Sequence, residues 1–426
     1  MKSLTTVTLP GSSREYEISV PKRNLGEVLS PAAVSSQSEL SALVERALAD
    51  PIGCPPLSET VSAGQSVLIV VDDITRTTPT DKIVPHLLEY LSTLGCREED
   101  ITLALALGTH RAMTDPEIEI KLGRDVARRF KVINTPAQEQ DAFVDTGESW
   151  GGVPIEVHRA VIDADIVIGV GSVVPHADAG WSGGCKIILP GMCSERTVME
   201  NHFLAAFFPS NLLGREVTSI RENMEGVVEK IGLDYILNVV VTPHGDVIDV
   251  KGGHFVAAQR AAMRAARDIF SVPFSNRVDI AVSNAYPAES DYWQASKGIW
   301  AGDLMVKPGG TVILNAPCPE GIGPHPEFMY WTGIDAREII AAVETGRLAD
   351  KTVAGGAVEI AHILEHIQLI VVSEGLSASE VNANGFAHFT SLQEAVDAHL
   401  AEADPDAKVG IITHGGYTYP ILEETK

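Results

Sequence analysis

Short apolar runs bounded by turn residues recur along the whole chain and alternate with segments of helical periodicity. The runs are Ser66–Val71, Ile101–Leu107, Asp165–Val170, Leu237–Val241, Val278–Ser283, Gly310–Asn315, Gln368–Ser373 and Lys408–Thr413. The helical segments are Asp81–Leu94, Gly253–Phe270, Asp335–Thr345, Ala357–Ile367 and Leu392–Ala403. Continuous apolar runs of this kind are typical of parallel strands buried on both faces. Their alternation with helices predicts an α/β fold with mostly parallel sheets flanked by helices.

The length of the chain predicts two domains. A chain of 426 residues is too long for one ordinary hydrophobic core. The clearest candidate for the domain boundary is Ser271–Arg277, a stretch rich in Pro, Ser and Asn between a long helical segment and a new strand. We therefore expect a first domain over 1–271 and a second over 272–407.

The charge balance limits the partners. With 32 Lys and Arg against 57 Asp and Glu, the formal net charge is −25, which disfavours nucleic acid and anionic membranes. An anionic ligand would therefore need a local basic pocket. Five cysteines are too few and too scattered for a disulfide framework, and no stretch approaches the roughly 18 apolar residues of a membrane span. We expect a soluble protein of the reducing cytoplasm.

Three polar turns follow predicted strands. They are Asp72–Arg76 after the first strand, Gly108–Arg111 after the second and Gly171–His176 after the third. In open α/β sheets ligands bind outside the carboxyl ends of the strands, so one shared crevice would bring these turns together. Helix capping is the alternative, because Asp and Thr are favoured there.

A lysine lies in a glycine-rich turn between two histidines. Lys186 follows Gly183 and Gly184, and His176 and His202 flank the segment. Such a lysine can bind phosphate or act as a nucleophile, and histidine is a common metal ligand and general base. The alternative is an ordinary turn that leads into a strand, with a lysine side chain that is exposed to solvent.

One further motif suggests a different chemistry. His362, Glu365 and His366 match the H-x-x-E-H pattern of some zinc proteases, with both imidazoles on one helix face. The same segment is equally typical of a helix with two polar positions. A zinc hydrolase built on it would need another ligand that the sequence does not identify.

Taken together, the motifs resemble the nickel-dependent lactate racemase family. They are Asp-Asp-x-Thr-Arg at 72–76, Gly-Thr-His-Arg at 108–111, Pro-His at 175–176, Gly-Gly-x-Lys through Leu-Pro-Gly at 183–191, Asn-His at 201–202 and Trp-Gln-Ala-Ser-Lys at 293–297. The resemblance implies an active site in the crevice between two domains, and a final segment, 408–426, that returns to the first domain. It also implies a nickel-pincer nucleotide, made with the help of cofactor-maturation proteins.

The resemblance implies a role for each candidate residue. His110 and His176 would be the catalytic pair, Lys186 the residue joined to the cofactor through a thioamide, and His202 the nickel ligand. The remaining cofactor-pocket residues would be Asp73, Thr75, Gly183 and Gly184, and the substrate-binding residues Arg76, Gln294 and Lys297. The implied activity is inversion of Cα in lactate or a related 2-hydroxy acid. The alternative is a protein that carries the cofactor without turnover.

The residues are suited to this chemistry in their own right. Inverting a carbon requires access from both faces, which two histidines from different strand ends can provide. Because the α-hydrogen of a hydroxy acid is very weakly acidic, hydride removal by an electrophilic cofactor is easier than proton removal. The sequence departs from the family pattern at Cys185, expected to be a small buried residue, and at Trp293. Trp300 and Trp331 are both candidates for a tryptophan of the second-domain pocket.

Overall fold

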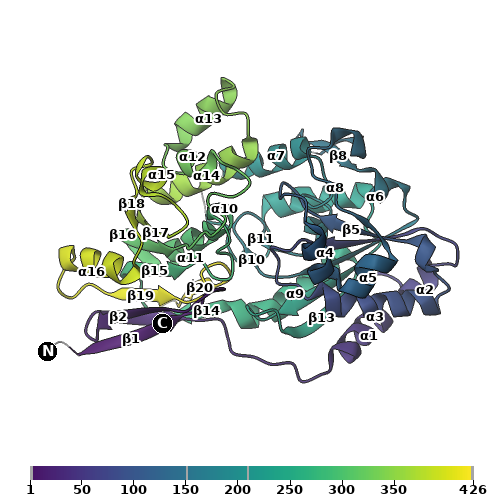
Figure 1. The fold of residues 1–426 in the computed structure, drawn as a ribbon, viewed down its shortest axis with the longest axis horizontal. Coiled ribbons are helices and arrows are strands. Elements are labelled where there is room, and N and C mark those ends of the chain that lie inside the picture. The colour runs from purple at the N-terminus through teal and green to yellow at the C-terminus, as the bar shows by residue number, and fades with distance from the viewer. Residues whose placement is uncertain (1–2, 150–151, 209–210, 424–426) are drawn as a thin grey trace.

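The computed structural model describes residues 3–149, 152–208 and 211–423. Figure 1 shows two α/β domains side by side, with the elements β10, β11 and α10 between them. Each domain is built on one six-stranded sheet with helices packed against it. The predicted fold class, two domains with mostly parallel sheets, is confirmed.

The sheet of the first domain has the order β13-β12-β9-β4-β5-β6. Its strands are β4 (Val67–Asp72), β5 (Ile101–Ala106), β6 (Lys131–Ile133), β9 (Ile166–Ser172), β12 (Tyr235–Val241) and β13 (Val247–Gly253). All neighbours are parallel except β12 and β13. The carboxyl ends of β4, β5 and β9 therefore lie at one edge of the sheet, where the three polar turns begin.

Helices cover both faces of this sheet. They are α1 (Leu40–Ala49), α2 (Leu57–Thr60), α3 (Thr80–Thr93), α4 (Asp115–Leu122), α5 (Arg124–Arg129), α6 (Arg159–Asp163), α7 (Glu195–Phe203), α8 (Ser219–Ile231) and α9 (Phe255–Phe270). Because alternate residues of a strand point to opposite faces, Ile69 packs in the core beneath α1, α3 and α9, while Val70 packs in the core beneath α6 and α8. Burial on both faces explains the continuous apolar runs.

The sheet of the second domain has the order β18-β17-β16-β15-β19-β3 and is parallel throughout. Its strands are β3 (Leu25–Leu29), β15 (Val278–Asn284), β16 (Val306–Asn315), β17 (Gln368–Val372), β18 (Ala387–Phe389) and β19 (Val409–Ile412). Its helices are α10 (Tyr292–Ala295), α11 (Lys297–Met305), α12 (Phe328–Thr332), α13 (Ala336–Glu344), α14 (Lys351–Leu364), α15 (Ala378–Asn382) and α16 (Leu392–Glu402). A hairpin of β1 (Leu4–Leu9) and β2 (Tyr16–Pro21) joins α16 on one face.

The ends of the chain depart from the expected boundaries. Strands β3 and β19 both belong to the second sheet, so residues 25–29 and 409–412 are not part of the first domain's sheet. The physical reason is pairing: β19 lies between β15 and β3, where it buries both of its edges. Beyond it, Tyr417 packs in a core of the first domain, and β20 (Tyr419–Leu422) pairs with β14 (Ser271–Phe274). Residues 424–426 of the expected returning segment lie outside the described residues.

Helix α14 begins six residues before the expected segment Ala357–Ile367. The first turns of this helix were not predicted because they contain Gly355 and Gly356, and glycine disfavours a helix interior. Gly355 is there for close packing: a Cβ on it would overlap the carbonyl of His202 in α7. The second domain therefore contacts the backbone of a candidate metal ligand.

Short strand pairs and 3-10 turns complete the first domain. The strand pairs are β7 (Phe143–Glu148) with β8 (Pro154–His158) and β10 (Pro175–His176) with β11 (Gly180–Trp181). The short 3-10 turns are η1 (Glu98–Asp100), η2 (Gln140–Ala142), η3 (Gly184–Ile187) and η4 (Leu204–Phe207). No helix in the described part of the chain is both long and apolar enough to cross a membrane.

The β10–β11 hairpin requires glycine at position 180. Gly180 has φ +71°, and a Cβ there would overlap the carbonyl of Arg215. We predict that Gly180→Ala lowers the free energy of unfolding by about 3 kcal/mol, measured by urea denaturation. The matched control is Gly346→Ala, at φ +72° with open space around it, which should cost about 1 kcal/mol through backbone strain alone. Equal losses in the two variants would contradict the overlap.

Candidate active site

One cavity between the two domains gathers most of the predicted site. The space between its lining residues is about 1350 Å³, including the part open to solvent. Nine predicted residues line it: Asp73, Arg76, His110, His176, Gly183, Lys186, His202, Gln294 and Lys297. The first seven come from the first domain and the last two from α10 and the start of α11. The predicted interdomain crevice is therefore present, and it brings these side chains together.

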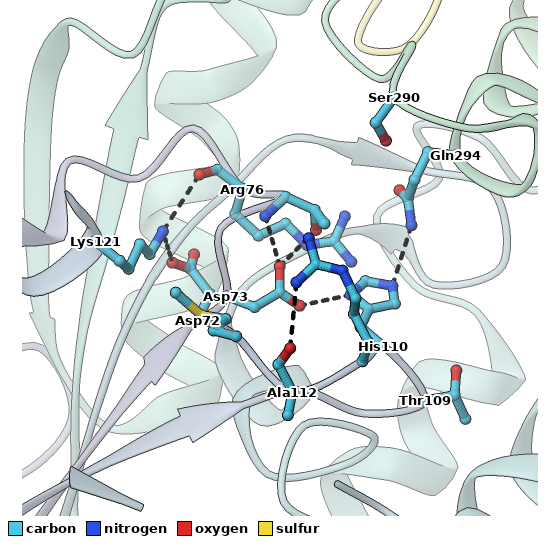
Figure 2. Close-up of polar contacts among 12 residues, drawn as sticks. Asp72, Asp73, Arg76, Thr109, His110, Ala112, Lys121, Ser290 and Gln294 are labelled. Carbon is cyan, nitrogen blue, oxygen red and sulfur yellow. Dashed lines mark hydrogen bonds and ion pairs between the residues drawn. The ribbon is translucent and has the colours of Figure 1, made fainter. Parts of the chain in front are cut away.

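A chain of polar contacts crosses the domain interface at His110. The His110 Nδ1 lies 2.5 Å from the Asp73 carboxylate, and His110 Nε2 lies 3.1 Å from the amide nitrogen of Gln294 (Figure 2). The Lys297 ammonium donates to Gln294 Oε1 at 2.5 Å. Because Lys297 Nζ donates to the amide oxygen, the Gln294 amide turns its NH₂ toward His110. His110 therefore accepts at Nε2 and donates from Nδ1 to Asp73.

Asp73 is buried and charged. It is 3% exposed and accepts hydrogen bonds from the backbone N–H of Thr75 at 2.8 Å and from its hydroxyl at 2.5 Å. Burial alone would raise the pKa of Asp73, but His110, Arg76 and Thr75 together hold that pKa well below its usual range. Thr75 itself is exposed and does not line the cavity. The Thr75 hydroxyl donates to Asp73, so its predicted place in the cofactor pocket stays a prediction.

His176 lies on the β10–β11 hairpin, away from His110. Its Nδ1 accepts a hydrogen bond from the backbone N–H of Asp178 at 3.3 Å. Burial, and then the positive charges of Lys186 and Lys297, lower the pKa of His176 well below its ordinary value. The imidazole is therefore neutral near pH 7 and available to accept a proton.

Lys186 sits in η3 behind a glycine turn. Gly183 has φ +74°, and a Cβ on it would meet Val173 and Asn238, so only glycine fits there. Gly184 does not line the cavity, and its N–H donates to Asn238 Oδ1 at 3.0 Å, which fixes the turn; its predicted contact with the cofactor stays a prediction. Burial, against the attraction of Asp178, lowers the pKa of Lys186 to about 8. A substantial fraction of neutral, nucleophilic amine is thus present near neutral pH.

His202 is oriented as a metal ligand would be. It lies in the last turn of α7, and its Nδ1 donates to the carbonyl of Val198 at 2.9 Å. This bond fixes the tautomer and leaves the Nε2 lone pair for the cavity, as in metal-binding histidines with a carbonyl partner.

The alternative zinc site is not assembled. His362 Nδ1 contacts Glu365 at 3.1 Å, while His366 Nε2 contacts Asp303 at 2.7 Å, so the two imidazoles engage different carboxylates. Among residues 3–149, 152–208 and 211–423, no group of three or more His, Cys, Asp and Glu side chains is placed to hold a metal ion. The zinc-hydrolase interpretation is therefore wrong for this segment.

Several contacts around the site escaped sequence reasoning. Lys121 is buried, pairs with Asp72 at 2.6 Å and donates to the carbonyl of Arg76 (Figure 2). It also donates to the carbonyl of Thr78. It therefore holds the whole turn that carries Asp73. The sequence showed Asp72 next to Asp73, but nothing in it indicated that Lys121, far along the chain, is the partner of Asp72.

A second contact across the interface supports the His110 turn. His325 of the second domain lies 3.2 Å from the hydroxyl of Thr109 and 2.7 Å from Asp350. Its ring also packs against Trp293, at a centroid distance of 4.6 Å. A single histidine between prolines carried no signal in the sequence.

The cavity wall from the second domain is aromatic with one acid. Trp293, Trp300 and Phe328 line it, so Trp300 is the candidate tryptophan that reaches the cavity and Trp331 does not. Glu359 in α14 is 8% exposed and faces Asp178. Burial and the neighbouring Asp178 carboxyl raise the pKa of Glu359 well above its usual value.

Comparisons with known proteins agree with this geometry. Residues 12–213 match the lactate racemase N-terminal domain, and residues 274–417 match the lactate racemase C-terminal domain. A lactate racemase of Lactiplantibacillus plantarum is 28% identical over 97% of this chain and 99% of its own, and one of Thermoanaerobacterium thermosaccharolyticum is 25% identical over 97% and 98%.

Two solved structures share the fold. The lactate racemase apoprotein of Thermoanaerobacterium thermosaccharolyticum superposes with a TM-score of 0.86 at 25% identity, covering 98% of this chain and all of that one. A Thermotoga maritima protein, at 22% identity, has a TM-score of 0.73 over 92% of this chain and all of its own. With both domain models matched in order over most of its length, the chain belongs to the lactate racemase family of isomerases.

Proposed function

We propose that this protein inverts Cα of lactate or a related 2-hydroxy acid by reversible hydride transfer to a tethered nickel-pincer nucleotide. The observation that carries the proposal is the convergence in one cavity of two histidines from separate elements, a lysine with a lowered pKa and a third histidine with a free Nε2. A non-catalytic carrier would need the lysine and the metal ligand but not a histidine pair.

The residues present fit the cofactor. Lys186 would be the attachment point, because its amine is partly neutral and its turn lets backbone approach closely at Gly183. His202 would ligate nickel through Nε2, a borderline ligand that suits this metal. When bound, the cofactor supplies an electrophilic carbon that accepts hydride and returns it.

The substrate carboxylate would be held by Arg76 and Lys297. Both line the cavity, one from each domain, and they supply the local positive charge that the acidic protein otherwise lacks. Burial, and then the charge of Arg76, lower the pKa of Lys297 well below its ordinary value. A bound carboxylate would favour the charged form of Lys297, so substrate binding and its protonation are coupled.

The histidines would move the hydroxyl proton. His110 Nε2 accepts the proton from one enantiomer as hydride leaves Cα, and the buried Asp73 carboxylate stabilises the resulting imidazolium. Gln294, which occupies Nε2 in this structure, would be displaced by the substrate hydroxyl. His176 would serve the other enantiomer, since it comes from a separate element.

The wider assignments rest on the same proposal. Delivery of the cofactor would require maturation proteins, and the substrate would be a small molecule. All five cysteines are free in the structure, which suits the proposed reducing cytoplasm.

The tether predicts a covalent adduct on Lys186. The intact mass of active protein should exceed the sequence mass by a nucleotide-sized group, and Lys186→Ala should remove it. Attachment should be faster at pH 8 than at pH 6.5, because the neutral fraction of an amine with a pKa of about 8 rises over that interval. The matched control, Lys297→Ala, should retain the adduct. Active protein at the bare sequence mass would contradict the covalent link.

The metal assignment predicts loss of nickel in His202→Ala. Nickel content, measured by inductively coupled plasma mass spectrometry, should fall sharply while the organic adduct stays on Lys186. His362→Ala is the matched control, because its imidazole contacts only Glu365 in the described structure and should leave nickel unchanged. Full nickel retention in His202→Ala would transfer the ligand role to another residue, with His176 the first to test.

The His110 tautomer predicts a large effect of Asp73→Asn. An asparagine can donate to Nδ1, which would place the proton on Nε2 and block the base. We expect the racemisation rate of adduct-bearing protein to fall about 10³-fold. Thr75→Val, which keeps the carboxylate and removes one hydroxyl donor, should reduce the rate far less. Nitrogen NMR of His110 should show the tautomer change, and an unchanged tautomer would contradict this mechanism.

The hydride mechanism predicts retention of isotope. Substrate deuterated at Cα should racemise in ordinary water with its deuterium largely kept, because hydride returns from the cofactor without meeting solvent. Single substitutions His110→Ala and His176→Ala should each slow inversion in both directions, since microscopic reversibility links the two faces. The measurement is mass spectrometry of the product combined with chiral chromatography. Rapid loss of deuterium would rule out hydride transfer even in a working racemase.

A further inference from the structure

A fully buried arginine lies behind the turn that carries Lys186. Arg221 belongs to α8 and its side chain is 0% exposed. It does not line the cavity, and none of the roles proposed above uses it. Burying a guanidinium is costly unless its donors are satisfied, so its partners indicate what it does.

Four contacts of the Arg221 side chain reach one short segment of chain, residues 179–185. Nε donates to the carbonyl of Ala179 at 3.0 Å, and Nη2 donates to the carbonyls of Trp181 and, at 3.5 Å, Ser182. Nη1 contacts the sulfur of Cys185 at 3.7 Å. The only acid paired with it among the described residues is Glu225, at 3.5 Å in the next turn of α8.

This segment joins two parts of the site. It begins in the hairpin that carries His176 and ends beside Lys186, and both parts face the cavity. Its backbone is irregular, so its carbonyls depend on local donors: besides Arg221, the Ala179 carbonyl accepts from the backbone N–H of Trp181 at 2.8 Å and the Ser182 carbonyl from Gln259 Nε2 at 3.1 Å. A buried carbonyl without a donor destabilises the fold by about 1–3 kcal/mol. The planar fork of one guanidinium supplies several donors at fixed angles.

Simple packing does not explain an arginine at this position. A methionine would fill similar space without the cost of burying a charge. The nearby Arg260 also pairs with Glu225, at 2.9 Å, so Glu225 does not depend on Arg221 for a partner. What Arg221 adds is one side chain that reaches the carbonyls of residues 179, 181 and 182 together.

We propose that Arg221 is the positioning residue of the tether: it binds the His176 hairpin and the Lys186 turn together, so that amine and imidazole face the cavity in a fixed arrangement before the cofactor arrives. The inference rests on the proposed function of Lys186. The positive charge of Arg221 also favours the neutral amine of Lys186. Burial is the main cause of the lowered pKa of Lys186, and Arg221 adds to it.

The test is acetylation of cofactor-free protein. Protein from a host without the maturation genes is treated briefly with acetic anhydride at pH 7.5, and peptide mass spectrometry gives the labelling of Lys186 relative to Lys297. Lys297 is a suitable reference because it faces the same cavity from the other domain. The variants are Arg221→Met, Arg221→Lys and, as matched control, Arg260→Met.

The expected result is a fall of about threefold in the Lys186 to Lys297 ratio for Arg221→Met, corresponding to a pKa rise of about half a unit. Arg221→Lys should restore most of the ratio, and Arg260→Met should leave it unchanged. If thermal melting shows that Arg221→Met is unfolded, Arg221→Gln replaces it with the same expectation. An unchanged or higher ratio in a folded Arg221 variant without charge overturns the proposal. Because this readout needs no cofactor, a missing adduct in the parent protein would overturn the tether separately.

Discussion

The site depends on one chain of polar contacts that crosses the domain interface. Asp73 and His110 follow neighbouring strands of the first sheet, and Gln294 and Lys297 come from α10 and α11 of the second domain. Each contact fixes the next, because Lys297 Nζ orients the Gln294 amide and that amide fixes the tautomer of the His110 imidazole. The tautomer of His110 that accepts a proton at Nε2 is therefore fixed only where the two domains meet. This explains why an active site of this kind needs two α/β domains.

The electrostatics of the cavity oppose those of the surface. The whole chain carries a net charge of −25, while Arg76, Lys186 and Lys297 converge in one enclosed space. Their mutual repulsion and burial lower the pKa values of both lysines. An anionic substrate or cofactor would relieve that repulsion, so the cavity is arranged to favour anions. The predicted local basic pocket is present in the structure.

The sequence predicted the parts of the site that depend on strand order. Apolar runs gave the strands, and the rule that ligands bind at carboxyl ends brought Asp73, His110 and His176 to one edge. The sequence did not show which way Thr75 and Gly184 face. Their orientations depend on hydrogen bonds to Asp73 and Asn238, respectively. It also missed Lys121, His325 and Arg221, whose partners are distant in sequence. Strand β3 was missed because its pairing with β19 spans almost the entire chain.

Helix α14 extends the argument from the domains to the metal ligand. Gly355 lets this helix approach the carbonyl of His202 so closely that no side chain fits between them. One turn further along, Glu359 lies beside Asp178 of the His176 hairpin, whose carboxyl helps to raise the pKa of Glu359. A single helix of the second domain thus contacts both the proposed nickel ligand and the hairpin of the second base. Any change in the angle between the domains would shift both, so the domain arrangement and the geometry of the reaction centre are set together.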